Sequence, residues 1–442
     1  MVPNPAIINA VEQLGYRVTV GDVATQAGLN VAIVEQGLLA IASDAGGHMQ
    51  VTETGDLVYL FPKNLRGVLR SRSLKLRLQE TGQKIWRVLF YLIRISFGTI
   101  LIASIVLILL AIVAIAIAAS NNRDEDDRGG GGGGMMIFPR LWSWDLFWIY
   151  DFGGQPRQHR DRPDGRGSGK DSKPDMNFLE SVFSFLFGDG NPNADLDERR
   201  WQAIGSVIQA NGGAVVAEQI APYIDDLGAD PDDEDYMLPV LLRFNGKPEV
   251  SPQGELVYHF PELQVRAVAS SPTPIAALQS GYLQEQSWPF SRAESGQLVM
   301  AAGLGVVNFV GAIVLGVMLG DGTIAAELGG LVGFVGAIYS VLLVYGTAFL
   351  AVPALRFFWL KGYNAKVKAR NTQRQTQAKA LIRKHAQIAP KLTYAQQFAK
   401  RQTISADDLA YTTETDLSTQ ELENPDRVDA EWKRRLESGS SN

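Results

Sequence analysis

The residue types that usually carry out chemistry are scarce in this chain of 442 residues. It has no cysteine, which excludes disulfides, thiolate catalysis, zinc fingers and iron–sulfur clusters held by its own thiolates. The histidines lie far apart and in no metal-ligand motif: His48, His159, His259 and His385. The acids offer no paired catalytic motif either: Glu12, Asp22, Asp44 and Asp56. We therefore expect no enzyme, no metal site and no cofactor.

The most informative feature is an internal repeat. Residues 51–62 read VTETGDLVYLFP, and residues 250–261 read VSPQGELVYHFP. With a shift of 199 residues, ten of the 29 positions from 34 to 62 are identical. With a slip of two more residues, the match extends back to Ala6 and Ala203. We predict two copies of one domain, residues 1–62 and residues 195–261.

Hydrophobic periodicity divides the first copy into three helices and three strands. Asn30 can cap the third helix and Gly46 can end it, and we expect Ile33, Leu38 and Ile41 to face the core. The expected helices are residues 5–14, 21–27 and 30–43, and the expected strands are 17–20, 49–52 and 57–61, with a tight turn at Thr54-Gly55.

The second copy divides in the same order, with helices at 196–210, 217–225 and 233–244 and strands near 249–251 and 256–260. Helix, strand, helix, helix, strand, strand is the order of a winged helix. The segment GDVATQAGLNVAIVEQGLLAIA resembles the helix-turn-helix of that family. The predicted fold is therefore a membrane protein with α-helical transmembrane segments and two duplicated α+β winged-helix-like domains.

The charges of both copies argue against the DNA reading that this shape suggests. A recognition helix needs Lys or Arg to neutralise phosphates and to contact base edges. Residues 30–43 hold no base and one acid, and the net charge is 1 − 6 = −5 over residues 1–62 and 4 − 13 = −9 over residues 195–261. We interpret both domains as protein-binding modules and expect no nucleic acid. The candidate partner surface is Glu35, Asp232, Asp233, Glu234 and Asp235.

Three uncharged apolar runs are long enough, as helices, to cross a bilayer core of about 30 Å. They are residues 95–119, 298–319 and 331–352, and only eleven residues separate the last two, which predicts an antiparallel hairpin. The runs hold no Asp, Glu, Lys, Arg or His, which disfavours a transporter. Small residues at four-residue spacing predict close helix packing in the hairpin: Gly316, Gly320, Gly329 and Gly333.

Basic segments flank the outer runs, at residues 63–94 and in a basic helical segment at 353–401. Positive residues next to a span stay in the cytoplasm, so both ends should lie there. The first cluster could also lie on anionic headgroups, or it could only fix orientation. The residues proposed for the membrane surface are Arg66, Arg70, Lys84, Arg87, Arg356 and Lys361.

Three crossings cannot leave both ends on one side. The aromatic stretch 135–152, within a flexible linker at 120–194, is the candidate for the missing return as an interfacial or re-entrant segment. Three or four crossings both remain open. Residues 262–297 form a second linker. Residues 402–442 hold ten acids and four bases, which predicts an acidic, mostly disordered tail.

Taken whole, the chain resembles a cyanobacterial and chloroplast-envelope membrane protein family, by the order of its parts and by the GDLVYLFP and GELVYHFP segments. Plant members are loosely labelled iron–sulfur cluster biosynthesis proteins, a label that a chain without cysteine does not support chemically. The resemblance implies the cyanobacterial plasma or thylakoid membrane, or the plastid envelope.

The function predicted from these features is that of a membrane-anchored interaction or scaffold protein. Its acidic modules, expected in the cytoplasm by the positive-inside rule, would dock partner proteins at the lipid surface, for example during assembly of membrane complexes. The alternative is a membrane-tethered transcription regulator, which would require basic surface on the modules.

Overall fold

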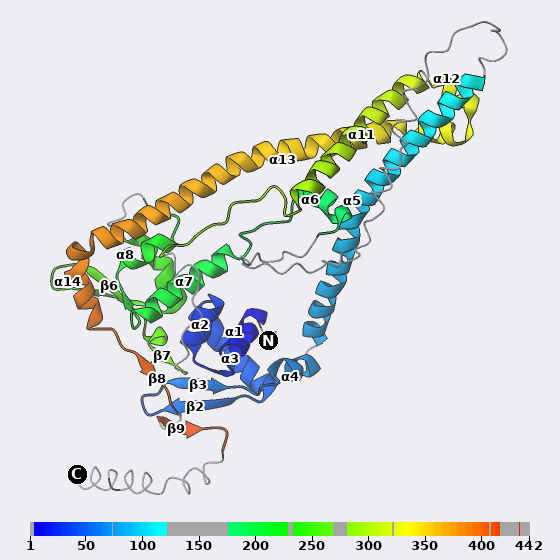
Figure 1. Cartoon of the computed structure of the whole chain (residues 1–442). Coiled ribbons are helices and arrows are strands. Elements are labelled where there is room, and N and C mark those ends of the chain that lie inside the picture. Colours follow the sequence, from blue (N-terminus) through cyan, green and yellow to red (C-terminus); the bar gives the residue numbers. More distant parts are fainter. Residues whose placement is uncertain are drawn as a thin grey trace, which may run out of the picture. The chain divides into compact units, whose positions relative to one another are not determined.

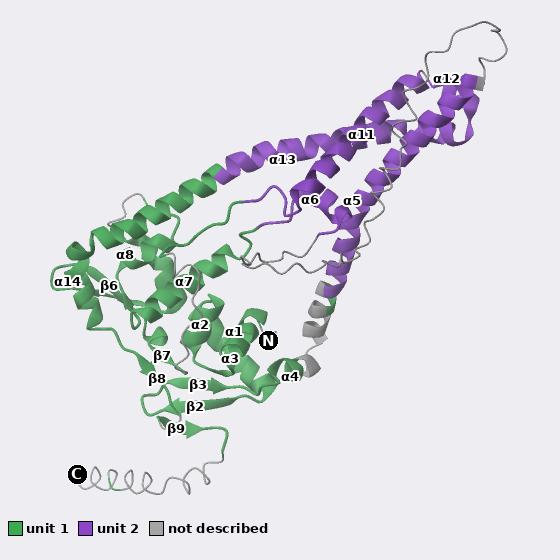
Figure 2. Ribbon diagram, viewed as in Figure 1, with its two compact units in different colours: residues 1–82, 192–287, 365–442 green, residues 83–191, 288–364 purple. Residues whose placement is uncertain are grey.

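The computed structural model describes residues 4–72, 74–121, 176–228, 233–267, 281–320, 322–405, 408–415 and 433. The chain divides into two compact units (Figure 2). Unit 1 comprises residues 1–82, 192–287 and 365–442, and unit 2 comprises residues 83–191 and 288–364. Most of the described chain is helical, and the strands form small sheets (Figure 1).

The first module of unit 1 has the three helices and three strands expected from hydrophobic periodicity. Thr19 and Asn30 cap the second and third helices, and Gly28 and Gly46 end them in left-handed conformation. The turn between the last two strands holds Gly55 at φ +87°. The elements are α1 (Pro5–Gln13), β1 (Arg17–Val18), α2 (Val20–Ala27), α3 (Val31–Ala45), β2 (His48–Thr52) and β3 (Leu57–Leu60).

The second module has the same sequence of helices and strands, but two of its helices are partly 3₁₀. The predicted helix 217–225 changes pitch at Ala221, next to Pro222, and the predicted helix 233–244 becomes α-helical only at Leu238, next to Pro239. The elements are α7 (Leu196–Ala210), β4 (Ala214–Val215), α8 (Ala217–Ile220), η2 (Ala221–Tyr223), η4 (Asp235–Met237), α9 (Leu238–Phe244), β5 (Lys247–Val250), β6 (Leu256–His259) and η5 (Pro261–Leu263).

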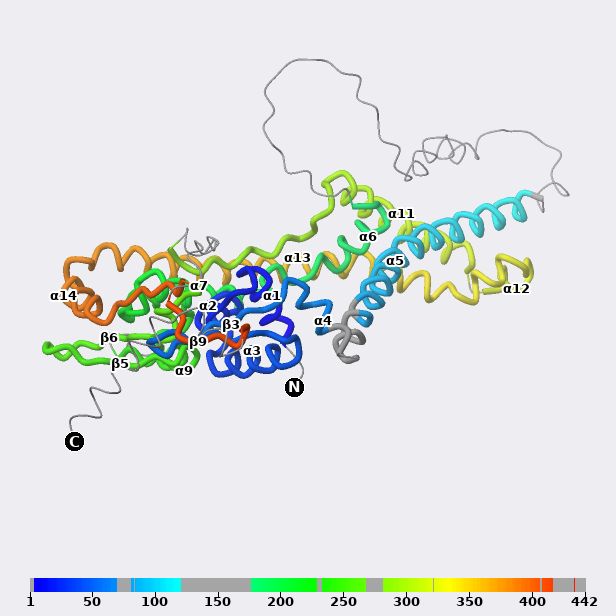
Figure 3. The backbone as a smooth tube through the Cα atoms, turned by 90° about the horizontal axis from the view of Figure 1, so that it is seen from below, coloured from blue at the N-terminus to red at the C-terminus, as the bar shows by residue number. Residues whose placement is uncertain are grey.

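The sheets of the two modules are antiparallel and have corresponding strand orders. The first sheet runs β1-β3-β2 and continues with β9 (Leu409–Thr412), and the second runs β4-β6-β5. In the first, Val18 pairs with Tyr59, and in the second Val215 pairs with Tyr258. Figure 3 shows β5 and β6 side by side as a hairpin.

One hydrophobic core extends through both modules. It includes α1, α2 and α3 of the first module and α7, α8 and α9 of the second. The helices α2 and α7 lie in contact, so that a Cβ added to Gly28 would meet the Glu198 carbonyl oxygen at 2.9 Å. In α3 the core residues are Val34, Leu38 and Ile41, whereas Ile33 is 51% exposed and was wrongly expected inside.

The C-terminal part of the chain completes unit 1. Beyond α13 (Gly330–Arg383) come α14 (His385–Gln396), β8 (Gln402–Thr403), which pairs in parallel with β7 (Val265–Arg266), and β9. The prediction of a mostly disordered tail from residue 402 is therefore wrong for residues 402–405 and 408–412. Ile404 is buried, and backbone pairing with β2 holds β9, which an acidic composition does not reveal. The other residues after 415, except 433, lie outside the described residues.

Among the described residues, three helices are long and apolar enough to cross a membrane, and their apolar parts belong to unit 2. They are residues Lys84–Ser120 of α5 (Leu74–Asn121), α11 (Ser295–Leu319) and α13 (Gly330–Arg383). The predicted boundary at residue 352 is not an end, because α13 continues through Pro353 into the basic segment. Shorter helices are α4 (Leu65–Arg72) in unit 1 and α6 (Phe178–Phe187) and α12 (Thr323–Leu328) in unit 2.

Contacts along these helices fix their directions within unit 2. Ser104 of α5 donates to Asn308 of α11 at 2.7 Å, and a Cβ on Gly311 would meet Ile108 at 3.0 Å, so α5 and α11 run parallel. The helix α13 runs antiparallel to α11. The connection between α5 and α6, residues 122–175, includes the aromatic stretch 135–152 and lies outside the described residues.

Candidate interaction surface

The predicted acidic surface separates into exposed and internal carboxylates. Glu35 on α3 is exposed, and so are Asp233 and Asp235 before α9. Glu234 is not available to a partner, because its carboxylate lies 2.5 Å from the Lys391 ammonium and accepts a hydrogen bond from Tyr258 at 2.7 Å. Its assignment to a partner surface is wrong. Asp232 lies outside the described residues.

Lys391 of α14 connects the C-terminal segment to the second module. Its ammonium lies 3.1 Å from Glu218 as well as 2.5 Å from Glu234. Burial alone would lower the pKa of Lys391, but the hydrogen bond that its ammonium donates to Glu234 and the nearby charge of Glu218 outweigh the burial and raise the pKa. The ammonium therefore stays charged and acts as a structural contact.

The third helices of both modules expose apolar side chains beside these acids. Leu238 and Leu242, one turn apart on α9, are 59% and 70% exposed, and Ile33 and Leu39 on α3 are also exposed. The two helices meet where the Asn30 side chain donates to the Leu242 carbonyl at 2.9 Å. We give the name acidic apolar face to the exposed apolar and acidic side chains of these two helices and of the residues just before α9, taken together: Ile33, Glu35, Leu39, Asp233, Asp235, Leu238 and Leu242.

Cationic side chains are missing from this face among the described residues. The helix α3 contains no Lys or Arg. The one base of α9 is Arg243, whose guanidinium carbon lies 4.1 Å from the Trp201 ring centroid. Arg243 also donates to the Gly28 carbonyl at 3.2 Å, and burial lowers its pKa. Arg243, the basic residue of α9 that could bind a phosphate backbone, is therefore occupied by contacts between the two modules.

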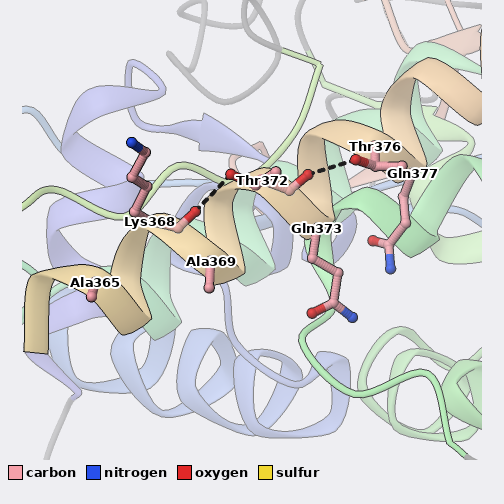
Figure 4. Close-up of a pocket in the computed structure, with 7 residues that line it drawn as sticks. All are labelled: Ala365, Lys368, Ala369, Thr372, Gln373, Thr376 and Gln377. Carbon is pink, nitrogen blue, oxygen red and sulfur yellow. Dashed lines mark hydrogen bonds between the residues drawn. The ribbon is translucent and has the colours of Figure 1, made fainter. Parts of the chain in front are cut away.

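A groove on unit 1 follows one face of α13 (Figure 4). Its hydroxyls are satisfied within the helix, because Thr372 donates to the Lys368 carbonyl at 2.9 Å and Thr376 to the Thr372 carbonyl at 2.8 Å. The groove thus has no converging polar groups. In the described ranges, no cluster of three or more His, Asp or Glu residues could hold a metal ion. The lining residues are Ala365, Lys368, Ala369, Thr372, Gln373, Thr376 and Gln377.

Buried ion pairs hold α13 on the second module. Arg374 is 1% exposed and contacts Asp225 and Glu285, the latter at 2.7 Å, and Arg370 contacts Glu285 at 2.6 Å. Burial would raise the pKa of Glu285, but hydrogen bonds from Arg370 and Arg374 outweigh it and lower the pKa. The sequence analysis missed this cluster, since its members lie far apart in the chain.

Several basic residues assigned to the membrane surface have protein partners. Arg66 pairs with Glu12 at 2.8 Å, and Leu65 and Leu69 of the same helix are buried in the core of unit 1. Arg356 donates to the Phe185 carbonyl at 2.9 Å. Arg356 therefore fixes α6. Leu65 and Leu69 pack α4 on the first module, whereas Arg66 is exposed, so its assignment to the membrane surface stays a prediction. The side chains of Lys84, Arg87 and Lys361 are exposed, and that of Arg70 lies outside the described side chains.

Aromatic and charged side chains gather at one end of the unit 2 helices. Trp86 lies near the start of the apolar part of α5, and Trp359 lies beyond the apolar part of α13, and both are exposed. Nearby on α5, Arg94 pairs with Asp189 at 2.7 Å. Trp and Tyr concentrate at membrane–water interfaces, so this end has the composition of an interfacial belt.

The four glycines predicted to allow close packing behave differently. A Cβ on Gly316 would clash with the Tyr339 hydroxyl, and one on Gly333 would meet the Ala325 carbonyl at 3.2 Å, so both permit close approach. Gly320 and Gly329 have φ of +56° and +54°, and a Cβ there would meet nothing within 4 Å. Their assignment to packing is wrong, because they end helices in a left-handed conformation.

A search for similar proteins found a relative over nearly the whole chain. The chloroplastic protein At5g03900 of Arabidopsis thaliana, whose name describes it as uncharacterised, is 36% identical over 440 residues. The match covers 97% of this chain and 81% of the relative. No family model matches the chain, and no solved structure matches it.

Proposed function

The chain belongs to the family of this Arabidopsis protein, and we propose that it is a membrane-anchored protein-interaction platform. Unit 2 would hold it in a plastid or cyanobacterial membrane through its three long apolar helices. Unit 1 would bind partner proteins. The observation that carries this proposal is the acidic apolar face. It presents exposed leucines and carboxylates at the positions where a DNA-binding winged helix needs Lys or Arg.

The two modules are proposed to be copies of one winged-helix domain. Corresponding glycines support this: Gly47 and Gly246 each lie so close to the phenylalanine directly after the third strand of their module that a Cβ would clash with the ring of Phe61 or Phe260. Corresponding backbone bonds support it further. The Phe61 amide donates to the Tyr16 carbonyl at 2.8 Å, and the Phe260 amide to the Gly213 carbonyl at 2.7 Å.

Both modules are proposed to lie on one side of the membrane. A single hydrophobic core shared by residues from both modules cannot form across a bilayer. The C-terminal segment would lie on the same side, since Arg374 and Lys391 bind the second module. The basic flanks favour the cytoplasmic side, or the stromal side in a plastid. An even number of passages between residues 94 and 192 would follow.

Capture of partners from native membranes by the full chain tests the proposal. The double variant Leu238→Asp with Leu242→Asp should reduce the amount of captured partner by about tenfold or more, because a few central apolar side chains contribute most of the binding energy of such interfaces. The matched control is Ile382→Asp, at a side chain 76% exposed on α13, which should leave capture unchanged.

Two results would contradict the proposed function. Capture that is equal in the double variant and the control would mean that the acidic apolar face binds no partner. Selective binding of duplex DNA by the full chain at physiological salt would favour a membrane-tethered regulator instead.

A further inference from the structure

The outer edge of strand β2 in the first module is occupied by the chain's own β9. The registered pairs are Gln50 with Thr412 and Val51 with Tyr411. Met49 makes two further bonds to Thr413: its amide donates to the threonine hydroxyl at 2.8 Å, and its carbonyl accepts from the threonine amide at 3.0 Å. The wing edge, meaning the outer edge of β2 over residues 48–52, is therefore a surface that binds an extended strand (Figure 1).

The corresponding edge of the second module is built differently. Met49 pairs with Tyr59 on the central strand, and Pro248 pairs with the corresponding Tyr258. A proline has no amide hydrogen to donate, so it blocks addition of a strand at an exposed edge. The next available acceptor, the Val250 carbonyl, takes a hydrogen bond from the Tyr394 hydroxyl at 3.1 Å. Only the first module has a wing edge whose geometry accepts a strand.

The strand that fills the wing edge is weakly held. It is four residues long, none of its side chains is fully buried, and the register shifts between Val51 and Thr52. Its charge is also unfavourable. Residues 404–416 contain four acids and no base, and the module that residues 409–413 pair with has a net charge of −5. The module's single base, Arg17, attracts Asp408, but the net charge stays negative on both sides. A short, exposed strand with like charge opens at low free energy.

We propose that the wing edge is a second docking site, where an extended basic segment of a partner protein replaces β9 by strand addition. Lys or Arg residues on either side of such a segment would face the acidic module and attract it, whereas the residues on either side of β9 are acidic. The proposal rests on the proposed function, in that it takes the acidic modules to be protein-binding. In the absence of the partner, β9 covers an edge that would otherwise be open to aggregation.

A second copy of this chain is a poorer occupant of the same edge. Its own residues 409–412 would bring the same acids. They would also compete with a strand tethered close by, because β8 and the bond from Arg17 to the Ile404 carbonyl, at 2.8 Å, fix the chain a few residues before β9. The tether gives β9 an effective concentration that an identical strand in solution does not reach.

A disulfide that locks β9 in place provides the test, because the native chain has no cysteine. Val51→Cys with Tyr411→Cys joins a registered pair, at a Cα separation typical of antiparallel strands. The probes are two labelled peptides with the core Leu-Ala-Tyr-Thr-Thr, one flanked by lysines and one by the native acids. Binding is measured with the full chain in detergent, oxidised and then reduced. The matched control disulfide is Lys247→Cys with His259→Cys, which joins β5 and β6 in the second module.

The reduced protein should bind the lysine-flanked peptide at least about tenfold more tightly than the acid-flanked peptide, and salt should weaken that binding. The oxidised protein should no longer bind the lysine-flanked peptide, whereas the control disulfide should leave the binding of that peptide unchanged. Equal binding by the oxidised and reduced forms, or no binding by the reduced form, would overturn the proposal. If the lysine-flanked peptide bound the oxidised and reduced forms equally, while both forms still captured a membrane partner through Leu238 and Leu242, the wing-edge proposal alone would fail and the proposed function would stand.

Discussion

Single residues decide which charges of unit 1 are structural and which are free to meet a partner. Glu234 and Glu35 occupy matching places in the repeat, yet Glu234 contacts Lys391 and Glu35 is exposed. Glu35, Asp233 and Asp235 are exposed acids, and their role as a partner surface stays a prediction. The sequence cannot predict that Lys391, 157 residues away, neutralises Glu234, because pairing over that distance depends on the tertiary fold.

The buried carboxylate of Glu285 should control the stability of unit 1. Its pKa is lower in the folded state, since Arg370 and Arg374 bind the charged form. The stabilisation is therefore present above the unfolded value of about 4.3 and is lost as the pH falls through the folded pKa. Glu285→Gln leaves Arg374 without its buried partner and should cost about 3 kcal/mol at pH 7.

Urea unfolding of the full chain in detergent, followed by hydrogen exchange in residues 365–383, measures this cost. The difference between wild type and variant should shrink as the pH falls below about 4. Glu255→Gln, at an exposed turn position, is the matched control and should unfold like wild type. An unchanged midpoint for Glu285→Gln at pH 7 would show that the buried pair does not stabilise unit 1.

Helices and strands follow the sequence closely where periodicity and caps agree. Asn30 caps α3 as expected, and α7 has its predicted bounds. Prolines explain the two helices of the second module that begin or end as 3₁₀. The strand β9 could not be predicted, since four residues in an acidic segment form a strand only because β2 offers them an edge.

Close packing between α11 and α13 gives a prediction for these elements. Gly316→Ala would force the Tyr339 hydroxyl out of its place, and overpacking of this kind costs about 1–3 kcal/mol. We expect a lower melting temperature of the full chain in detergent. Tyr339→Phe in the same chain should restore part of the loss, because it removes the clashing oxygen.

The matched control for this helix is Gly303→Ala. Gly303 is also within α11, but a Cβ there would meet nothing within 4 Å. Alanine favours a helix over glycine by about 1 kcal/mol, so this variant should be as stable as wild type or more stable. If both variants had the same melting temperature, the packing at Gly316 would not limit stability.

At the scale of the whole molecule, unit 1 is assembled from three separate stretches of the chain. Hydropathy predicts the three long apolar helices, but it treats each soluble stretch by itself. The joint core and the ion pairs of Arg374 were not predicted, because the residues that form them are separated by the membrane helices. The sequence leaves open whether the chain crosses the membrane three or four times. The answer depends on whether these separate stretches assemble on one side.

The claim on which the account rests is that both modules and the C-terminal segment lie on one side of the membrane. Single cysteines at exposed positions test it in a chain that has none of its own: Ser43→Cys, Gln253→Cys, Thr415→Cys and, between α11 and α13, Glu327→Cys. In sealed right-side-out vesicles, an impermeant maleimide should label only Glu327→Cys, and the other three should react after the membrane is opened. Labelling of Gln253→Cys in sealed vesicles while Ser43→Cys stays protected would place the two modules on opposite sides and contradict the account.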